Sequence, residues 1–343
     1  MSEMTGLVSA VGVAPLADPL REGQEEHRGV GLPAAAADAA APSPVRSTDV
    51  VRRSTEVKRS FFGDLAEIFR ELWEFRDLVH QLTLRDIRVR YTQAVMGFAW
   101  AIFAPMLVVL SGLLIRYALA HASGRQVSMA AIGATALKAV PWSFFSGALN
   151  LATASLISNK SLITKLYFPR EAIPLATVLA QTKDLGVAFA VLAIILPFLG
   201  LTVSINLLWV PLLVLLLLTY TLACAVFLSC ANLFYRDVKY VVQLLLTFGI
   251  FLTPIFFEPQ AYGPIGARLL MLNPLAPIIE GLRLAVIDGR TLLEPVFEVN
   301  RRGVSILVWS PWHLLYSAVW AVGGLLVGLR LFRRVTYVFA EYV

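Results

Sequence analysis

The segment Ser158-Asn-Lys-Ser-Leu-Ile-Thr-Lys-Leu-Tyr-Phe-Pro-Arg-Glu-Ala-Ile-Pro174 lies between two long apolar stretches of the chain. Its Lys160, Lys165 and Arg170 lie close to the ends of these stretches, and basic residues beside membrane helices favour the cytoplasmic side. The segment is too short to be a domain, yet it carries apolar residues that a solvated connector does not need: Leu162, Ile163, Leu166, Tyr167 and Phe168. We therefore expect this cytoplasmic loop to dock onto another protein.

The composition predicts an integral membrane protein. Hydrophobic residues make up 58% of the 343 residues, charged residues only 15%, and the mean hydropathy is +0.72, whereas soluble proteins carry roughly 25% charged residues. The net charge of +6 fits contact with anionic lipid. The sequence contains no basic face with interleaved aromatic residues, the pattern that would indicate nucleic-acid binding. Cys224 and Cys230 lie in one apolar run and predict no disulfide framework.

Two N-terminal segments differ from the rest of the chain. Residues 1–58 are rich in Ala, Pro, Gly and Ser without a periodic apolar face, which predicts a disordered, dispensable tail. From Phe61 to Leu82 apolar residues recur every three or four positions and charged residues fill the other face. This pattern predicts an amphipathic helix lying in the lipid headgroup plane; packing on a soluble domain is the alternative. With the basic run that follows, it forms an interfacial segment over residues 59–93.

Six stretches are apolar and long enough to cross a bilayer core, which takes roughly 20 helical residues. They cover about residues 95–120, 131–157, 173–199, 205–232, 239–257 and 304–329. A further apolar stretch, Leu269–Val286, is interrupted by Pro274 and Pro277 and fits re-entrant or interfacial helices better than a span. We predict an all-α integral membrane fold in which residues 94–343 form a six-helix transmembrane domain.

The distribution of Lys and Arg predicts the orientation of these spans. Six spans place residues 58–93, 158–172, 233–240 and 330–343 on the same side of the membrane as the two termini, and these segments hold 15 Lys and Arg residues. The loops on the other side, within 121–130, 200–204 and 258–303, hold six. Because basic residues favour the cytoplasmic side, both termini are expected to be cytoplasmic, in a multi-pass protein of the cytoplasmic (inner) membrane.

Four charged residues fall inside predicted spans, where an unpaired charge costs at least a few kcal/mol. We expect Arg116 and Lys138, near the outer ends, to extend toward the headgroups. Lys183 and Asp184 lie deeper and, as neighbours, point about 100° apart on a helix, so each requires a partner on another helix or a wet cavity. A buried structural ion pair and a water-filled pathway both satisfy this requirement. Arg116, Lys183 and Asp184 are the candidate intramembrane or pathway charges.

Aromatic residues are frequent in the spans. Most of them are expected in lipid-facing belts or in packing, but a subset facing a pore would offer flat apolar surfaces along which sugar rings slide. The candidates for such a channel lining are Trp142, Phe144, Phe145, Tyr220, Phe248 and Phe251.

Several catalytic signatures are absent from the sequence. It contains no G-x-x-x-x-G-K-[ST] phosphate loop, no H-E-x-x-H and no G-x-S-x-G. The acidic residues of 258–303 show no paired-acid or metal-ligand spacing. We therefore predict that the chain is not an enzyme, holds no metal or cofactor, and takes the energy for any uphill transport from another polypeptide.

Several motifs occur in the order found in one known family. They are Arg90-Tyr-Thr-Gln-Ala-Val-Met-Gly-Phe-Ala-Trp100, Pro141-Trp-Ser-Phe-Phe145, Ser158-Asn-Lys160 with Lys165-Leu-Tyr-Phe-Pro-Arg-Glu171, Asn232-Leu-Phe-Tyr-Arg-Asp-Val238, Leu252-Thr-Pro-Ile255, and Leu272-Asn-Pro274 with Glu280-Gly-Leu-Arg283. Over about residues 60–343 the chain resembles the permease subunits of ATP-binding-cassette exporters of polysaccharides such as O-antigen, capsule and teichoic acid.

The resemblance implies a homodimeric permease that binds two copies of a separate ATPase subunit, which holds the ATP. It implies that Lys160, Lys165, Leu166, Tyr167, Phe168, Arg170 and Glu171 belong to the coupling loop for that ATPase. It also implies that the 61–82 helix lies at the membrane interface, that 264–287 forms outer re-entrant helices, and that the substrate is a lipid-linked glycan. The chain departs from the family pattern in its tail and in the extra residues 287–303.

Two alternatives remain beside polysaccharide export. One is an exporter permease of the same build that handles drugs or lipids. The other is a membrane enzyme acting on lipid-linked sugars, for which clustered acids or a metal site would be needed.

Overall fold

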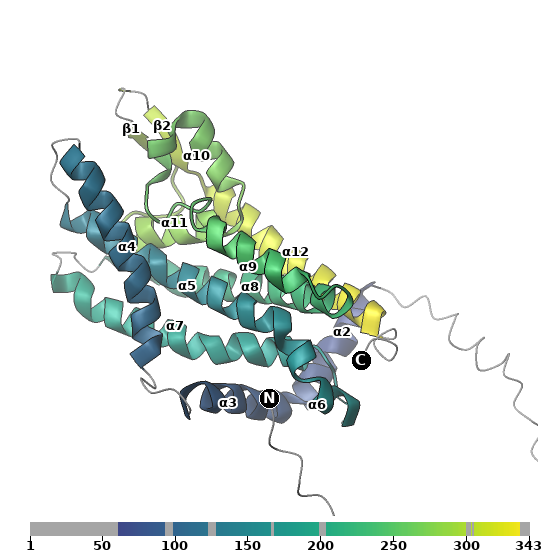
Figure 1. Cartoon of the computed structure of the whole chain (residues 1–343). Helices are drawn as coiled ribbons and strands as arrows, with labels where there is room; N and C mark the ends of the chain where they lie inside the picture. Colours follow the sequence, from purple (N-terminus) through teal and green to yellow (C-terminus); the bar gives the residue numbers. More distant parts are fainter. Residues whose placement is uncertain are drawn as a thin grey trace, which may run out of the picture. The chain divides into compact units, whose positions relative to one another are not determined.

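The computed structural model describes residues 61–92, 99–122, 128–165, 168–198, 204–299, 303 and 305–336, and the predicted tail lies outside them. Figure 1 shows these residues as long helices with one β-hairpin. The longer helices are α2 (Phe61–Glu74), α3 (Arg76–Thr92), α4 (Trp100–Ala122), α5 (Met129–Ser158), α7 (Ala172–Phe198), α8 (Trp209–Phe234), α9 (Val238–Gly249), α11 (Leu275–Val286) and α12 (Pro311–Thr336). The shorter elements are α6 (Lys160–Lys165), η2 (Ile205–Leu208), η3 (Pro259–Tyr262), α10 (Gly263–Met271), β1 (Val296–Val299) and β2 (Ser305–Trp309).

Helix α5 runs through the middle of the bundle. It packs against α4, α7, α8, α9 and α11, while α8 packs along α12. Small residues make the close approach possible, since Ala139, Ala148 and Ala152 on α5 are fully buried and small side chains let helix backbones come together in membranes. This packing makes α5 the central helix of the bundle.

Among the residues that the structure describes, four helices are long and apolar enough to cross a membrane: Met129–Ser158, Ala172–Pro197, Ile205–Phe234 and Pro311–Val335. They coincide with the second, third, fourth and sixth predicted spans. The sixth begins later than expected, because residues Ser305–Trp309 pair as a strand and the helix starts at Pro311. The chain is thus a multi-pass membrane protein with a mainly helical fold.

The other two predicted spans are shorter in apolar length. Helix α4 has 23 residues, of which Val109–Ala118 form an apolar helical segment. Helix α9 has 12 residues and gives way to turns that continue to the start of η3. The count of six spans therefore stays a prediction.

The apolar stretch interrupted by prolines forms the end of α10 and helix α11, and their re-entrant or interfacial position stays a prediction. Helix α11 is buried along almost its whole length. The link between α10 and α11 is tied to α12, because Tyr316 Oη donates a hydrogen bond to the carbonyl of Leu272 (2.7 Å) and Ser317 Oγ to that of Pro274 (2.7 Å). We call the end of the bundle that carries α10, α11 and the strands the hairpin end.

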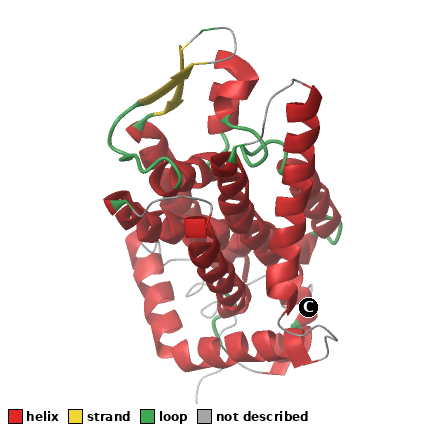
Figure 2. Cartoon of the chain, turned by 90° about the vertical axis from the view of Figure 1, so that its left-hand side faces the viewer, coloured by secondary structure: helices red, strands yellow, loops and turns green. Residues whose placement is uncertain are grey.

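The prediction of an all-α integral membrane fold is confirmed, and the described residues add a short β-hairpin to it. Strands β1 and β2 are antiparallel, with Phe297 opposite Leu307 and Glu298 opposite Ile306. Trp309 is fully buried and its Nε1 donates a hydrogen bond to the carbonyl of Leu292 (2.9 Å). The extra residues 287–303 are therefore in part a docked structural element, which lies beside α10 in Figure 1 and whose strands are yellow in Figure 2.

The predicted amphipathic helix consists of two helices, α2 and α3, separated at Phe75. Helix α2 packs on α12 and α3 runs along α7. Leu65 and Ile68 are buried in a cluster that includes Phe332, while Trp73 stays 70% exposed. Part of the apolar face of α2 therefore packs inside the protein and part stays exposed. The place of α2 in the headgroup plane stays a prediction. We call this end of the bundle the α2 end.

Candidate functional site

The predicted docking segment, residues 158–171, follows directly on α5 at the α2 end. Asn159 joins the two parts: its Nδ2 donates to the carbonyl of Ser155 (2.8 Å), and its own carbonyl accepts from the amides of Leu162 and Ile163. The short helix α6 follows, with Lys160 and Lys165 exposed. Leu166 and Tyr167 lie outside the described residues. The segment therefore presents basic side chains at the surface on a helix fixed to a span.

Part of the apolar face of this segment is turned inward. Ile163 and Phe168 are 8% and 7% exposed and pack in the same cluster as Ile68 of α2. The expectation that these side chains need a protein partner is therefore wrong for Ile163 and Phe168, because α2 and its neighbours cover them. In the segment they serve to hold α6 in place, while Lys160 and Lys165 stay exposed at the surface.

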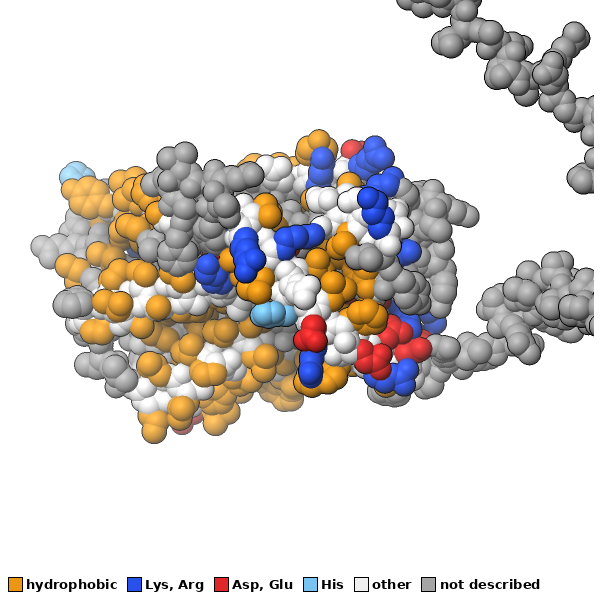
Figure 3. Space-filling model, turned by 90° about the horizontal axis from the view of Figure 1, so that it is seen from below, with side chains coloured by type: hydrophobic (Ala, Val, Ile, Leu, Met, Phe, Trp, Pro, Cys, Tyr) orange, Lys and Arg blue, Asp and Glu red, His pale blue; other side chains and the backbone are white. Residues whose placement is uncertain are grey.

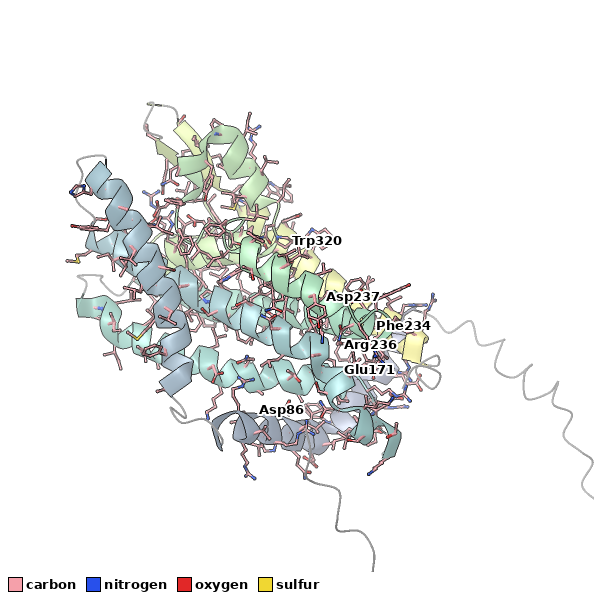
Figure 4. The ribbon with its side chains drawn as sticks, in the orientation of Figure 1. Asp86, Glu171, Phe234, Arg236, Asp237 and Trp320 are labelled. Carbon is pink, nitrogen blue, oxygen red and sulfur yellow. The ribbon has the colours of Figure 1, made fainter. Side chains whose placement is uncertain are left out.

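Glu171 closes the segment and is buried. Burial raises the pKa of the Glu171 carboxyl, and the nearby Arg333 charge acts in the opposite direction. Figure 4 shows Glu171 on the same end of the molecule as Arg236 and Asp237, which lie at the corner between α8 and α9. The C-terminal end of the docking segment is thus buried inside the bundle.

A group of ion pairs joins α2 to the last turns of α12. Arg333 Nη2 lies 3.0 Å from Glu71 Oε1 and 3.4 Å from Glu67 Oε2, and Arg330 Nη2 lies 3.5 Å from Asp64 Oδ2. These side chains are 18–34% exposed. We call them the α2-end ion cluster. Together with the Glu171 carboxyl it brings the interfacial helix, the docking segment and the last span to one place.

Helix α3 adds a second link to the docking segment. Arg85 Nη2 donates to Asn159 Oδ1 (2.8 Å) and to Asp86 Oδ1 (2.8 Å), and Asp86 Oδ2 accepts from Thr177 Oγ1 of α7 (3.4 Å). Figure 3 shows basic and acidic side chains gathered on this face with apolar side chains between them. The face thus combines charge with apolar surface, which suits contact with a protein or with lipid headgroups.

The structure gives Asp184 a partner on another helix. Arg90 Nη1 of α3 lies 2.8 Å from Asp184 Oδ2 and also donates to Gln181 Oε1. The two charged side chains are 27% and 21% exposed, and Lys183 is exposed. Asp184 is therefore held by an ion pair between α3 and α7, and the choice between a structural pair and a water-filled pathway stays a prediction.

A cluster of buried charges lies at the hairpin end. Arg283, 7% exposed, contacts Glu280 (Nε to Oε1, 2.6 Å), Asp288 (Nη1 to Oδ2, 2.8 Å) and Glu298 (Nη2 to Oε1, 3.2 Å). Lys138 Nζ of α5 lies 3.7 Å from Glu280 Oε2, and both side chains are fully buried. We call these five residues the hairpin-end charge cluster. It joins α5, α11, the segment after α11 and β1.

The expectation for the outer charges was wrong for Lys138 and Arg116. Lys138 is fully buried, and Arg116 is 12% exposed, with its Nη2 2.7 Å from Glu258 Oε1. Carboxylates supply their partners, so neither needs to extend toward headgroups. Although burial opposes the shift, the charges of Lys138 and Arg116 hold the pKa of Glu258 below its usual range.

The six candidate aromatic residues divide into two groups. Trp142, Phe144 and Phe145 are buried, and Phe145 stacks on Tyr220 with ring centroids 5.8 Å apart. These four rings are packing residues of the bundle. Phe248 and Phe251 are instead 59% and 55% exposed, on and just after α9, and share its surface with other exposed apolar side chains: Val241, Leu244, Leu245 and Leu252.

Sequence reasoning did not find the two ion clusters. The sequence shows Lys138, Glu280 and Arg283 as separate charges, and Arg330 and Arg333 only as part of the charge asymmetry. One usable signal was the Glu280-Gly-Leu-Arg283 spacing, which places both side chains on one helix face. The pairs between α12 and α2 had no such signal, since Arg333 and Glu71 are 262 residues apart.

Comparison with known proteins gives a consistent result. The ABC-2 type transporter family matches residues 77–287. The chain is similar to two O-antigen export system permease proteins RfbA of Klebsiella pneumoniae, 26% and 27% identical over 266 residues, which is 77% of this chain and 94% of each relative. It is similar to RfbA of Myxococcus xanthus, 24% identical over 249 residues, 72% of this chain and 94% of that protein. The family match spans more than half of the chain and includes α3 to α11, the docking segment and most of the hairpin-end charge cluster. The chain therefore belongs to the ABC-2 type transporter family.

Proposed function

We propose that the chain is the permease subunit of an ATP-driven exporter that moves a lipid-linked polysaccharide, of the O-antigen, capsule or teichoic-acid kind, across the cytoplasmic membrane. The observation that carries the proposal is the similarity to the O-antigen export permeases RfbA, which covers 94% of their length. The sequence has no phosphate loop, so ATP is bound and hydrolysed by a separate ATPase subunit.

The ATPase docks at the α2 end, which faces the cytoplasm together with both termini. The excess of Lys and Arg in the segments on this side supports the orientation. Lys160 and Lys165 are exposed on α6, and such side chains can pair with acids in a cleft of the ATPase. Arg170 and the neighbouring Leu166 and Tyr167 complete the contact.

Two copies of the chain form the working permease, with two ATPase subunits, and the glycan passes between the copies. Helices α4 and α9 support this arrangement because both carry rows of exposed apolar side chains: on α4 Phe103, Met106, Leu107, Leu110, Leu114 and Tyr117, and on α9 Leu244, Leu245 and Phe248. Apolar side chains exposed on a membrane helix contact lipid or another membrane protein, and we assign the rows on α4 and α9 to the second copy. Phe248 and Phe251 are the candidates for contact with the glycan.

Reconstitution tests the proposal most directly. Permease and ATPase purified together in vesicles are expected to move lipid-linked glycan only when ATP is present, and deletion of the permease gene is expected to leave the glycan inside the cell. A permease variant with Lys160 and Lys165 changed to Glu, reconstituted with the same ATPase, tests the docking site. This variant should insert normally but lose coupling to ATP hydrolysis. Normal surface glycan with no accumulated intermediate in the deletion strain would exclude polysaccharide and favour a drug or lipid exporter.

A further inference from the structure

The hairpin between α11 and α12 has apolar side chains on both faces. An antiparallel pair with one face in the core usually alternates between apolar and polar residues. In β1 and β2 the buried positions are Val296, Ile306, Val308 and Trp309. The exposed positions include Phe297 and Leu307, which lie opposite each other, and Val299. The second apolar face has no cover among the described residues.

The buried face fixes the hairpin to the bundle. Trp309 and Val308 are fully buried, and Glu298 on β1 is held by Arg283 of α11 at 3.2 Å. Gly289, with a φ of 59°, provides the turn after α11, and Asn206 Nδ2 donates to its carbonyl (2.6 Å). The exposed face therefore has a fixed position relative to the spans.

The position of that face is set by the start of α12. Only Ser310 separates β2 from this helix, which is apolar and long enough to cross a membrane. Trp312, in the first turn, is 74% exposed, and exposed Trp residues at the ends of spans mark the membrane–water interface. The hairpin therefore lies at the depth where α12 enters the membrane.

The neighbouring helix α10 has the same surface character and packs against β2. Ile265, Leu269 and Leu272 are 75%, 61% and 62% exposed, and Arg268 is exposed between them. Apolar side chains interspersed with Arg are typical of segments that lie in the headgroup region. The apolar surface thus continues from α12 through α10 to the hairpin.

We propose that the exposed face of the hairpin, formed by Phe297, Val299 and Leu307, inserts into the lipid interface on the side of the membrane opposite the ATPase. Its occupant is phospholipid, at the boundary between headgroups and acyl chains. The hairpin then anchors α11 and the hairpin-end charge cluster at a fixed membrane depth. This inference rests on the membrane fold and does not depend on what the protein exports.

A depth measurement with single fluorescent probes tests the proposal. Cys224 and Cys230 are replaced by Ala, and one Cys is introduced in place of Phe297 or Leu307 and labelled with an environment-sensitive dye. Val319→Cys, 62% exposed on α12, is the lipid control, and Lys165→Cys on α6 is the aqueous control. Each protein is placed in nanodiscs of phosphatidylethanolamine and phosphatidylglycerol, with spin labels either high or low on the acyl chains.

The Phe297 and Leu307 probes are expected to be quenched by the high label, to within about twofold of the Val319 probe, and less by the low label. Quenching by water-soluble iodide as strong as at Lys165, with none from labelled lipid, would overturn the proposal. Protection from both lipid and iodide would also overturn it, because a protein then covers the face. Crosslinking through the Phe297→Cys position would identify a second copy in that case.

Discussion

The two ends of the bundle use ion pairs in opposite ways. At the hairpin end Arg283 meets acids only 3, 5 and 15 positions away in the sequence, and the side chains of Lys138 and Glu280 are fully buried. At the α2 end Arg333 meets Glu71 across 262 positions, and the paired side chains are 18–34% exposed. In the first cluster the Arg283 pairs are local and the central residues Lys138, Glu280 and Arg283 are dry, while Asp288 and Glu298 at its edge are 24% and 22% exposed. The second cluster is long-range and partly wet throughout.

This difference indicates different mechanical roles. Buried charges tolerate little rearrangement, because losing a partner leaves an uncompensated charge in a medium of low dielectric. Partly exposed pairs lose less when they separate, since water replaces the partner. We infer that the hairpin end is a rigid frame and that the α2 end is the adjustable side, which suits the end proposed to follow a motor.

The largest effect is expected at Glu280. Glu280→Ala leaves both Lys138 and Arg283 without their shared partner and should lower the free energy of unfolding by about 3–5 kcal/mol, with loss of inserted protein. Thermal unfolding in detergent measures this loss, and Glu294→Ala, at an exposed position of the same region, is the control. Equal stability of the two variants would contradict a rigid hairpin end.

An intermediate effect is expected at Asp184, whose side chain is 21% exposed and paired with Arg90. Asp184→Ala should lower the free energy of unfolding by about 1–3 kcal/mol, less than Glu280→Ala because water reaches the site. Protein abundance and transport are measured together. Lower abundance indicates a structural pair, and normal abundance with altered transport indicates a wet pathway. Wild-type values for both would exclude both roles.

A smaller effect on stability is expected at Arg333. Arg333→Ala should cost about 1 kcal/mol, since its ion pairs are partly solvated. Its effect on coupling should be larger, because the residue joins α2 to α12 beside Glu171. The measurement is the ratio of ATP hydrolysed to glycan moved, with exposed Arg334→Ala as the matched control. An unchanged ratio would remove the α2-end ion cluster from the coupling route.

The smallest effect is a pH dependence from Glu258. The folded protein holds the pKa of this carboxyl below the ordinary 4.5, so its contribution to stability is present above that value and is lost as the pH falls through the folded-state pKa. Glu258→Gln should therefore have a flatter decline of melting temperature below about pH 4.5 than the wild type. Parallel curves for the two proteins would show that Arg116 does not depend on the Glu258 charge.

The long apolar helices and the amphipathic helix α2 could be predicted because their signals are local. A run of about 20 apolar residues or a three-to-four periodicity is fixed by the neighbours in the chain, and α2, α5, α7 and α8 follow such patterns. The hairpin was missed because Ser305–Trp309 adds five mostly apolar residues to the start of α12. An apolar strand that precedes a span without a break has the same composition as the span.

The candidate site was predictable only in part. The basic residues of the docking segment were found from their position between two spans. The burial of Phe168 and the partners of Arg333 and Lys138 depend on helices that meet after folding, and sequence separation hides such contacts. Asp184 shows the boundary: its need for a partner followed from membrane energetics, but Arg90 became visible only when α3 was placed along α7.

The length of α9 has a consequence for how the protein enters the membrane. At 1.5 Å per residue, its 12 residues span about 18 Å, against a hydrocarbon core of about 30 Å. After the exposed Phe251 and Leu252, the irregular chain is enclosed by protein: Thr253 is 1% exposed, Ile255 is fully buried, and Thr253 Oγ1 accepts a hydrogen bond from Asn273 Nδ2 (3.2 Å). This segment alone would expose unpaired backbone groups to lipid.

Helix α9 therefore has to be inserted into the membrane together with neighbouring helices. Asn232 Oδ1 accepts a hydrogen bond from the amide of Lys239 (3.2 Å), which fixes the corner between α8 and α9 and brings α9 back beside a strongly apolar helix. We expect the translocon to release α8 and α9 together. The chain after α9 obtains its protein cover only after α11 has been synthesised. During that interval the irregular backbone after α9 is exposed to lipid, and quality-control proteases are expected to recognise it there.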